Sequence, residues 1–178
     1  LSVEIAKAKA TGAELAMVVT RLNDAILMIR EMIKQRWEPM GIMSPGSPGM
    51  YEEQFFATLG KYSEYPISVV PWYNPKTELS RIVEAAFKRK FPNDRLVGHA
   101  LNVGFTFEAI LVAADAAQRA GSTRPEALIE ALRKTNIEKR MMIGGPIVFD
   151  EKGQNKNVQS AVLQNRDGGS KVVLPKEA

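Results

Sequence analysis

Residues 141–153 read MMIGGPIVFDEKG, and this stretch says most about the fold. It follows a long Ala-rich helix pattern that ends at Gly121. The β-branched run Ile147–Phe149 predicts a strand, which leads directly into a turn at Asp150–Gly153. Asp starts such turns, and Gly supplies the positive φ that closes them. The chain therefore changes here from helical to β-rich structure.

The composition is that of an ordinary soluble protein. The 178 residues are enough for one domain or two small ones, 45% of them are hydrophobic and 25% are charged. The formal net charge is +4, but the Lys and Arg residues are scattered beside Glu along helix patterns. We therefore expect a solvated, mildly basic surface and no nucleic-acid partner.

The chain has no cysteine and a single histidine, His99. Disulfides, thiolate nucleophiles and Cys-ligated metals are excluded, and an imidazole-based metal site is not expected. No cofactor is predicted. No apolar run approaches about 20 residues, so we expect no membrane-spanning helix. If the protein is exported, its signal peptide is expected to lie outside this sequence.

Residues 1–90 alternate between helix and strand patterns. This alternation predicts an α/β fold built from parallel β-α units. The strand pattern at Ala13–Val19 is apolar throughout, which predicts burial on both faces. Pro71 favours an edge or exit position for its strand. The expected helices are Ser2–Ala10 capped by Ser2, a second ending near Arg36, Met50–Leu59, and one capped by Thr77 and ending at Lys90. The expected strands are Ala13–Val19, Gly41–Met43 and Ile67–Trp72.

The second half opens with a long helix pattern at Ala100–Ala120. Thr123–Glu126 has the pattern of a capping box, with Pro125 in the first turn of a further helix. Strands are expected at Ile147–Phe149, Val158–Leu163 and Val172–Leu174, and the last two are expected to form a hairpin.

Five stretches in a fixed order carry a resemblance to a known family. They are ATGAE at 10–14, FEA at 107–109, AAQRAGST at 116–123, PEAL at 125–128 and GGPIVFDEKGQ at 144–154. In this order they resemble the periplasmic branched-chain amino-acid-binding protein family, the type I solute receptors of ABC importers. The resemblance covers essentially the whole chain and depends on the ordered set, because no single motif is highly specific.

The resemblance implies two α/β lobes joined by three crossovers, with a ligand trapped between them. The chain resembles only the C-terminal half of such a receptor. Residues 1–95 would form most of lobe two, 96–142 would be helices of lobe one, and 143–178 would supply a hinge strand and the last strands of lobe two. The long helix would then lack its natural cover. We therefore expect the chain, studied alone, to be a dimer or a proteolysed remnant.

Ligands bind beyond the carboxyl ends of parallel strands, which here means the loops Thr20–Asp24 and Ser44–Gly49. We predict ligand contacts from Thr20, Arg21, Ser44, Gly46 and Ser47 in these loops, together with Trp72 and Phe107 elsewhere. The Ser hydroxyls, beside N–H groups left accessible by Gly46 and Gly49, suit a carboxylate. The alternative is a plain Pro/Gly connection.

Arg21 could grip a carboxylate with its planar guanidinium. The alternative is a surface ion pair with Asp24 or Glu14. Trp72 could form an aromatic wall with Tyr73. The alternatives are core packing for Trp72 and a turn role for Tyr73.

Two departures from the family pattern bear on the ligand. Family members carry an acidic residue for the ligand's ammonium group in the loop that matches Ser44–Gly49, and that loop has no Asp or Glu here. At the start of the long helix, where family members often carry a tyrosine, this chain has Phe107. A buried ammonium without a partner is unfavourable, so we expect a small organic acid without an α-amino group, aromatic acids included. An amino acid stays the alternative, because the other half could supply the missing partner.

The expected function is that of a periplasmic solute-binding receptor that delivers its ligand to the membrane permease of an ABC importer. The alternative is a cytosolic ligand-sensing regulatory domain on the same fold. The sequence has no Gly-x-Gly-x-x-Gly, no phosphate-binding loop ending in Gly-Lys-Ser/Thr and no Gly-x-Ser-x-Gly. We therefore do not expect an enzyme.

Overall fold

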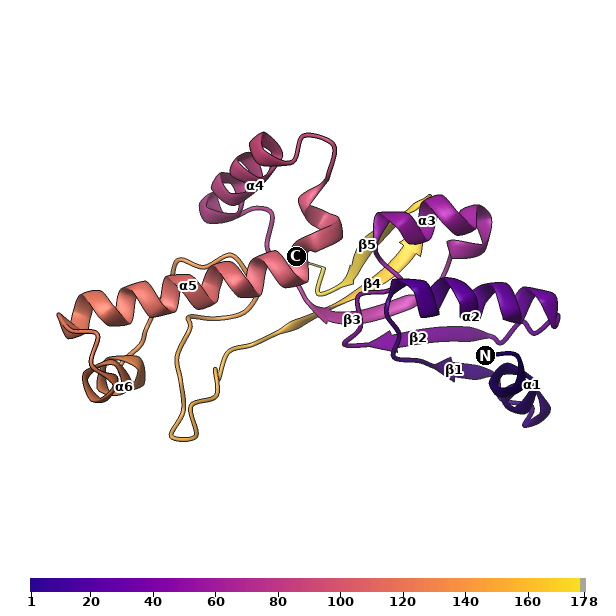
Figure 1. The fold of residues 1–178 in the computed structure, drawn as a ribbon, viewed down its shortest axis with the longest axis horizontal. Helices are drawn as coiled ribbons and strands as arrows, with labels where there is room; N and C mark the ends of the chain where they lie inside the picture. Colours follow the sequence, from indigo (N-terminus) through magenta and orange to yellow (C-terminus); the bar gives the residue numbers. More distant parts are fainter. Residues whose placement is uncertain (177–178) are drawn as a thin grey trace. The chain divides into compact units, whose positions relative to one another are not determined.

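The backbone is organised around a five-stranded sheet with the strand order β1-β2-β3-β4-β5 (Figure 1). The computed structural model describes residues 1–176. Strands β1 and β2 are parallel, as are β2 and β3, whereas β4 and β5 form an antiparallel hairpin. The strand bounds are β1 Leu15–Met17, β2 Gly41–Pro45, β3 Ile67–Pro71, β4 Ser160–Arg166 and β5 Gly169–Leu174. The predicted α/β class and the C-terminal hairpin are confirmed.

Helices alternate with the first three strands and then follow one another. They are α1 Ser2–Ala10, α2 Leu22–Lys34, α3 Glu53–Leu59, α4 Glu78–Lys90, α5 Ala100–Ala120 and α6 Pro125–Arg133, with short 3-10 helices η1 Gly60–Ser63 and η2 Leu96–His99. The Thr77 hydroxyl accepts a hydrogen bond from the Ser80 N–H (3.1 Å), as a helix cap should. Helix α5 ends at Gly121 with φ of 57°. Both predicted helix ends are confirmed.

Two predicted N-terminal caps are wrong. Helix α1 is preceded by Leu1, and Ser2 is its first helical residue. Helix α6 is preceded by Arg124, so the expected capping box does not form. Pro125 keeps Arg124 extended, because a residue before proline avoids the helical region. The helix therefore starts one residue later than the Thr123 pattern suggested.

The chain divides into two compact units. Unit 1 contains Leu1–Val70 and residues 161–176, and unit 2 contains Pro71–Ser160. The sequence placed the boundaries near residues 95 and 142. In the structure α4 belongs to unit 2 together with α5 and α6, and the second boundary follows Ser160. The assignment of these parts to the two lobes of a receptor stays a prediction.

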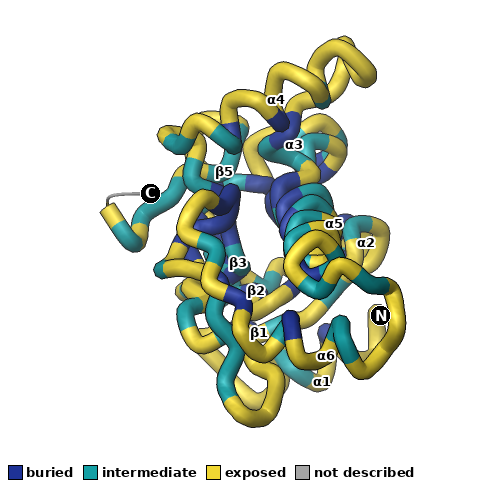
Figure 2. The backbone as a smooth tube through the Cα atoms, turned by 90° about the vertical axis from the view of Figure 1, so that its left-hand side faces the viewer, coloured by how far each residue is buried: buried dark blue, intermediate teal, exposed yellow. Residues whose placement is uncertain are grey.

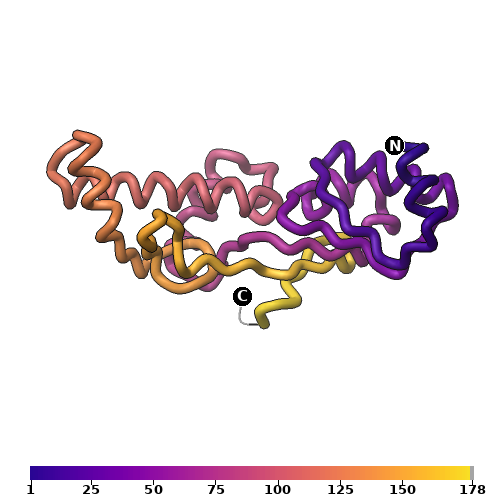
Figure 3. Tube along the Cα trace, turned by 90° about the horizontal axis from the view of Figure 1, so that it is seen from below, coloured from indigo at the N-terminus to yellow at the C-terminus, as the bar shows by residue number. Residues whose placement is uncertain are grey.

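In unit 1 the helices gather on one side of the strands (Figure 3). Their apolar side chains form a core with the buried face of the sheet, including Ala16, Ala25, Ile29, Met32, Met50 and Phe55. Strand β1 was expected to be buried on both faces, and this is wrong. Leu15 is 48% exposed and Met17 67% exposed. Strand β1 is an edge strand, and only its Ala16 side points into the core.

In unit 2 helix α5 is the longest element, and α4 is exposed along most of its length (Figure 2). By length and composition alone, the stretch Leu96–Ala120 could cross a membrane, with a mean hydropathy of 1.5 in its most apolar window. The expectation that no helix spans a membrane stays a prediction. Only 22% of that window is buried. Helix α5 thus carries apolar surface that the described residues leave largely uncovered.

The predicted strand at Ile147–Phe149 forms isolated bridges instead of a regular ladder. Ile147 pairs with Ile137 and Phe149 pairs with Asn155, both in antiparallel orientation. The following turn is as expected: the Asp150 carboxylate accepts the N–H groups of Lys152 (2.9 Å) and Gln154 (2.8 Å), and Gly153 has φ of 79°.

Candidate functional site

Two loops of unit 1 meet beyond the carboxyl ends of β1 and β2. The Thr20 N–H donates to the Ser47 hydroxyl oxygen (3.1 Å), and the Ser47 hydroxyl donates to the Thr20 carbonyl oxygen. Ser47 is buried. A methyl group at Gly49 would lie 2.7 Å from the Arg21 carbonyl carbon and 2.9 Å from the Thr20 carbonyl oxygen. The two loops are therefore in direct backbone contact, and the structure brings Thr20, Arg21 and Ser47 together.

The Ser47 hydroxyl has a structural role as well as a predicted binding role. It bonds to both backbone groups of Thr20, so it holds the first loop against the second. Backbone N–H groups beside Gly46 and Gly49 were expected to be accessible to a ligand. The N–H of Gly46 itself is not among them, because it donates to the Val69 carbonyl oxygen (2.7 Å). A glycine is needed at position 46 because φ is 71° there, and residues with a side chain rarely adopt this backbone conformation.

Arg21 lies at the start of α2. Its backbone is extended, and no side chain caps the helix. Residues 1–176 offer the Arg21 guanidinium no hydrogen bond or ion pair, so the expected alternative of a pair with Asp24 or Glu14 is not formed. The side chain is exposed. An unpaired guanidinium beside the free N–H groups of a helix N-terminus favours an anion.

Three hydroxyl groups at this end of the sheet have no hydrogen-bond partner within residues 1–176: those of Thr20, Ser44 and Ser68. The expected loop at Ser44–Gly49 starts later than predicted, because β2 extends to Pro45. Ser44 is consequently paired with Ser68 in the parallel register of β2 and β3. Both side chains are fully buried. Buried hydroxyls normally find partners, so a group of three without them marks an unusual polar spot.

Sequence reasoning missed Ser68. The available signal was a hydroxyl residue inside the otherwise apolar run ISVVP. Because strand register is non-local, the sequence could not place it opposite Ser44.

The other two predicted contacts, Trp72 and Phe107, belong to unit 2. Trp72 is 3% exposed and its ring centroid lies 5.6 Å from that of Tyr73. The two rings pack against each other, as the alternative interpretation of Trp72 expected. Burial raises the pKa of the Tyr73 hydroxyl, and the negative charge of Glu84 adds to this effect. Phe107 is half-buried on α5.

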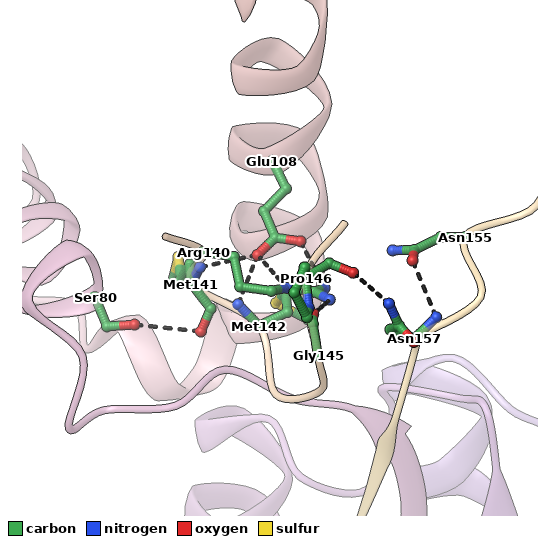
Figure 4. A network of polar contacts seen from close by, with 9 residues as sticks. All are labelled: Ser80, Glu108, Arg140, Met141, Met142, Gly145, Pro146, Asn155 and Asn157. Carbon is green, nitrogen blue, oxygen red and sulfur yellow. Dashed lines mark hydrogen bonds and ion pairs between the residues drawn. The ribbon is translucent and has the colours of Figure 1, made fainter. Parts of the chain in front are cut away.

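The sequence also gave no sign of a buried ion pair in unit 2, next to Phe107. The Glu108 carboxylate of α5 bonds to the Arg140 guanidinium at 2.8 and 3.2 Å (Figure 4). Both side chains are less than a tenth exposed. The two residues are 32 positions apart, so no local pattern pairs them.

The Glu108–Arg140 ion pair and one face of α5 border a groove of about 450 Å³ in unit 2. Its walls come from α5, α6 and the segment around Ile147–Val158, and they are mostly apolar; Phe105, Val112 and Leu132 are among the lining residues. The described part of the chain has no cluster of three or more Asp, Glu or His side chains that could hold a metal ion. The groove is thus an apolar surface with one neutralised polar patch.

Known proteins share this fold. A family model described as periplasmic binding protein matches residues 1–170. No curated protein matches the chain.

Solved structures with the same fold include a leucine binding protein from Thermotoga maritima, with 19% identity and a TM-score of 0.76 over 96% of this chain and 47% of that one. A branched chain amino acid ABC transporter protein from Thermus thermophilus with bound valine has 14% identity and a TM-score of 0.77, over 97% and 48%. An extracellular ligand-binding receptor from Rhodopseudomonas palustris has 17% identity and a TM-score of 0.75, over 97% and 51%. The chain spans about half the length of these proteins.

Proposed function

The chain belongs to the periplasmic binding protein family, and from this premise we propose that it is part of a solute-binding receptor whose unit 1 loops hold the carboxylate of a small ligand. The receptor binds its ligand without changing it chemically. The observation that carries the proposal is the unpaired Arg21 guanidinium at the N-terminus of α2, beside loops joined by Ser47. Guanidinium and free helix N–H groups are complementary to a carboxylate.

The hydroxyl groups of Thr20, Ser44 and Ser68 support an oxygen-rich ligand. Each could donate one hydrogen bond, and none has a partner within the described residues. Ser44 and Ser68 are fully buried, and the Thr20 hydroxyl oxygen is buried too, although other atoms of Thr20 are partly exposed. Of the three residues, we assign Thr20 to ligand contact. Trp72 stays a proposed contact because it directly follows β3 at the carboxyl end of that strand. Phe107 stays one because of the family resemblance.

The proposed ligand is a small organic acid without an α-amino group, aromatic acids included. Two of the similar structures are described as a leucine binding protein and as a protein with bound valine. The loop at residues 44–49 of this chain offers no Asp or Glu to an ammonium group. Leaving such a charge unpaired in a closed site would be costly. An amino acid is the second candidate, and it requires an acidic partner from elsewhere in the receptor.

We further propose that the receptor works outside the cytoplasm and delivers its ligand to the permease of an ABC importer. The similar structures include proteins described as parts of ABC transporters. Ligand-loaded and empty receptors differ in the closure of their lobes, and a permease would select the loaded form.

The apolar groove of unit 2 is proposed to pack against the rest of the receptor. The chain matches about half the length of similar structures over nearly its whole length. Helix α5 is largely uncovered although it is apolar, and contiguous apolar surface of this kind marks an interaction site.

Calorimetry on the complete receptor containing this chain tests the ligand class. Leucine, valine, benzoate and 4-hydroxybenzoate are titrated into the wild type and into the variants Arg21→Met and Arg30→Met. Arg30 is the control because it is also exposed on α2, more than two turns from the loops.

Arg21→Met should weaken acid binding by about tenfold or more, as expected for loss of a charge-assisted hydrogen bond. Arg30→Met should have no effect. Tight leucine binding without any response to the aromatic acids would refute the proposed ligand class. Equal affinities in the two variants would refute the role of Arg21.

A further inference from the structure

The Glu108 carboxylate lies at the centre of a buried network in unit 2. Its Oε1 accepts the backbone N–H groups of Met141 (2.9 Å) and Met142 (2.7 Å) and the Nε–H of Arg140 (3.2 Å). Its Oε2 accepts from Nη2 of Arg140 (2.8 Å). Figure 4 shows the carboxylate reaching from α5 toward this segment. Two successive N–H groups of the 141–142 segment are therefore satisfied by a side chain instead of by a strand.

The opposite edge of the same segment holds the residues around Tyr73. The Asn74 N–H donates to the Met141 carbonyl oxygen (2.8 Å), and the Ile143 N–H donates to the Trp72 carbonyl oxygen (2.8 Å). Tyr73 and Met142 form an antiparallel bridge between these two bonds. Ser80 adds a bond from its hydroxyl to the Met141 carbonyl oxygen (3.3 Å). Residues 72–74 are thus held through the 141–143 segment.

We infer that Glu108 is a positioning residue: its carboxylate takes the place of a neighbouring strand, and through residues 141–143 it fixes the backbone that carries Trp72. The inference rests on the proposed function where it links Trp72 to ligand binding. That Glu108 holds residues 141–143, and through them residues 72–74, follows from the hydrogen bonds alone.

Charge balance explains why a carboxylate can serve here. A buried anion needs a cation and hydrogen-bond donors. Arg140 supplies the cation, and its Nη1 donates to the Gly145 carbonyl oxygen (2.8 Å), which ties the end of the segment to the same centre. Met141 and Met142 are both buried. Without the carboxylate these buried N–H groups would lose their hydrogen-bond acceptor.

Two measurements test the inference: backbone amide exchange and tryptophan fluorescence. Both are made on the Trp37→Phe background, in which Trp72 is the only tryptophan of the sequence and its fluorescence reports on its surroundings. The variants are Glu108→Ala, which removes the acceptor, and Glu108→Gln, which keeps one carbonyl oxygen. Glu64→Ala is the matched control. Its carboxylate also accepts two successive N–H groups, those of Asp167 (2.9 Å) and Gly168 (2.8 Å), but in unit 1 and at the surface.

In Glu108→Ala the amides of Asn74 and Ile143 should exchange about tenfold faster or more, since opening of the segment is no longer opposed by the charged acceptor. Trp72 emission should shift to longer wavelength as water reaches the ring. Glu108→Gln should show smaller changes in the same amides. Glu64→Ala should affect only its own turn and leave Trp72 emission unchanged.

Unchanged exchange of Asn74 and Ile143 in both Glu108 variants would overturn the inference. Uniformly faster exchange across unit 1 and unit 2 in Glu108→Gln would also overturn it, because that result means general destabilisation. If Glu108→Ala does not fold, Glu108→Gln decides. Failure of the wild type to bind any tested acid would refute the proposed function and leave the amide result standing.

Discussion

Replacing Gly49 with alanine would place a methyl group inside the contact between the two site loops. The new Cβ would lie 2.7 Å from the Arg21 carbonyl carbon, 2.8 Å from its oxygen and 2.9 Å from the Thr20 oxygen, whereas ordinary contacts start at 3.4 Å. The loops must therefore separate by about 0.7 Å at the closest point, and every atom in the way is backbone. Gly49 does not have a left-handed φ, so the effect is purely steric.

The loop cannot easily give way, because the next residue is anchored. Met50 is fully buried, and its carbonyl oxygen accepts a hydrogen bond from the Asn165 side chain (2.8 Å). Overpacking of this kind costs roughly 1–3 kcal/mol. We expect Gly49→Ala to lower the free energy of unfolding by that amount and to weaken acid binding by about tenfold, since Arg21 moves with its backbone.

Urea denaturation and calorimetry measure the two effects of Gly49→Ala. The control is Gly169→Ala on β5, where an added methyl group meets no atom within 4 Å and φ is not left-handed. The control should leave stability and binding within error of the wild type. If Gly49→Ala behaves like Gly169→Ala in both measurements, the loops are not in the contact described and the reasoning fails.

Three further predictions concern the core, the pH response and association. Asn165→Ala should lower the free energy of unfolding by about 2–4 kcal/mol, because the buried amide donates to two backbone carbonyl oxygens; a change below 1 kcal/mol (about one ordinary hydrogen bond) in urea denaturation would contradict this. The raised pKa of Tyr73 means that the folded state favours the neutral phenol, so its contribution is present below pH 10.0 and is lost as the pH rises through the higher folded-state pKa. Tyr73→Phe should therefore lose less stability than the wild type between pH 9 and pH 11 (a span chosen about the ordinary tyrosine pKa), and equal losses in denaturant titrations would count against the assignment. The isolated chain should associate through α5, as static light scattering would show. Ile110→Asp on α5 should shift it to monomer, whereas Ile82→Asp on α4, of similar exposure, should not; a monodisperse wild-type monomer would refute this.

Features set by neighbouring residues were predictable from the sequence. The bounds of α5, its glycine end and the Thr77 cap all depend on backbone groups within one turn of the helix. The Asp150–Gly153 turn is likewise self-contained, because the aspartate bonds to N–H groups two and four residues later. The positions of the two site loops followed from the alternation of helices and strands.

Features set by distant partners were not predictable. The apolar run around β1 indicated full burial, but its exposure depends on which helices cover the sheet. The contact of Ser47 with Thr20 spans 27 residues and that of Glu108 with Arg140 spans 32. The Ile147–Phe149 run had strand composition but found only single bridging partners. Composition gives a tendency, and the available neighbours decide the outcome.

Unit 1 consists of two segments that are far apart in the sequence, and this affects how it can fold during translation. Residues 1–70 emerge before the β4 strand that completes their sheet, which begins only at Ser160. Asn165 must then reach back to Met50 and Ser63 to fill the interior. During translation the sheet formed by β1, β2 and β3 therefore lacks β4 until about 90 intervening residues have been made. At typical synthesis rates this takes roughly 5–20 seconds. Protection of the nascent chain by chaperones matters most in that interval.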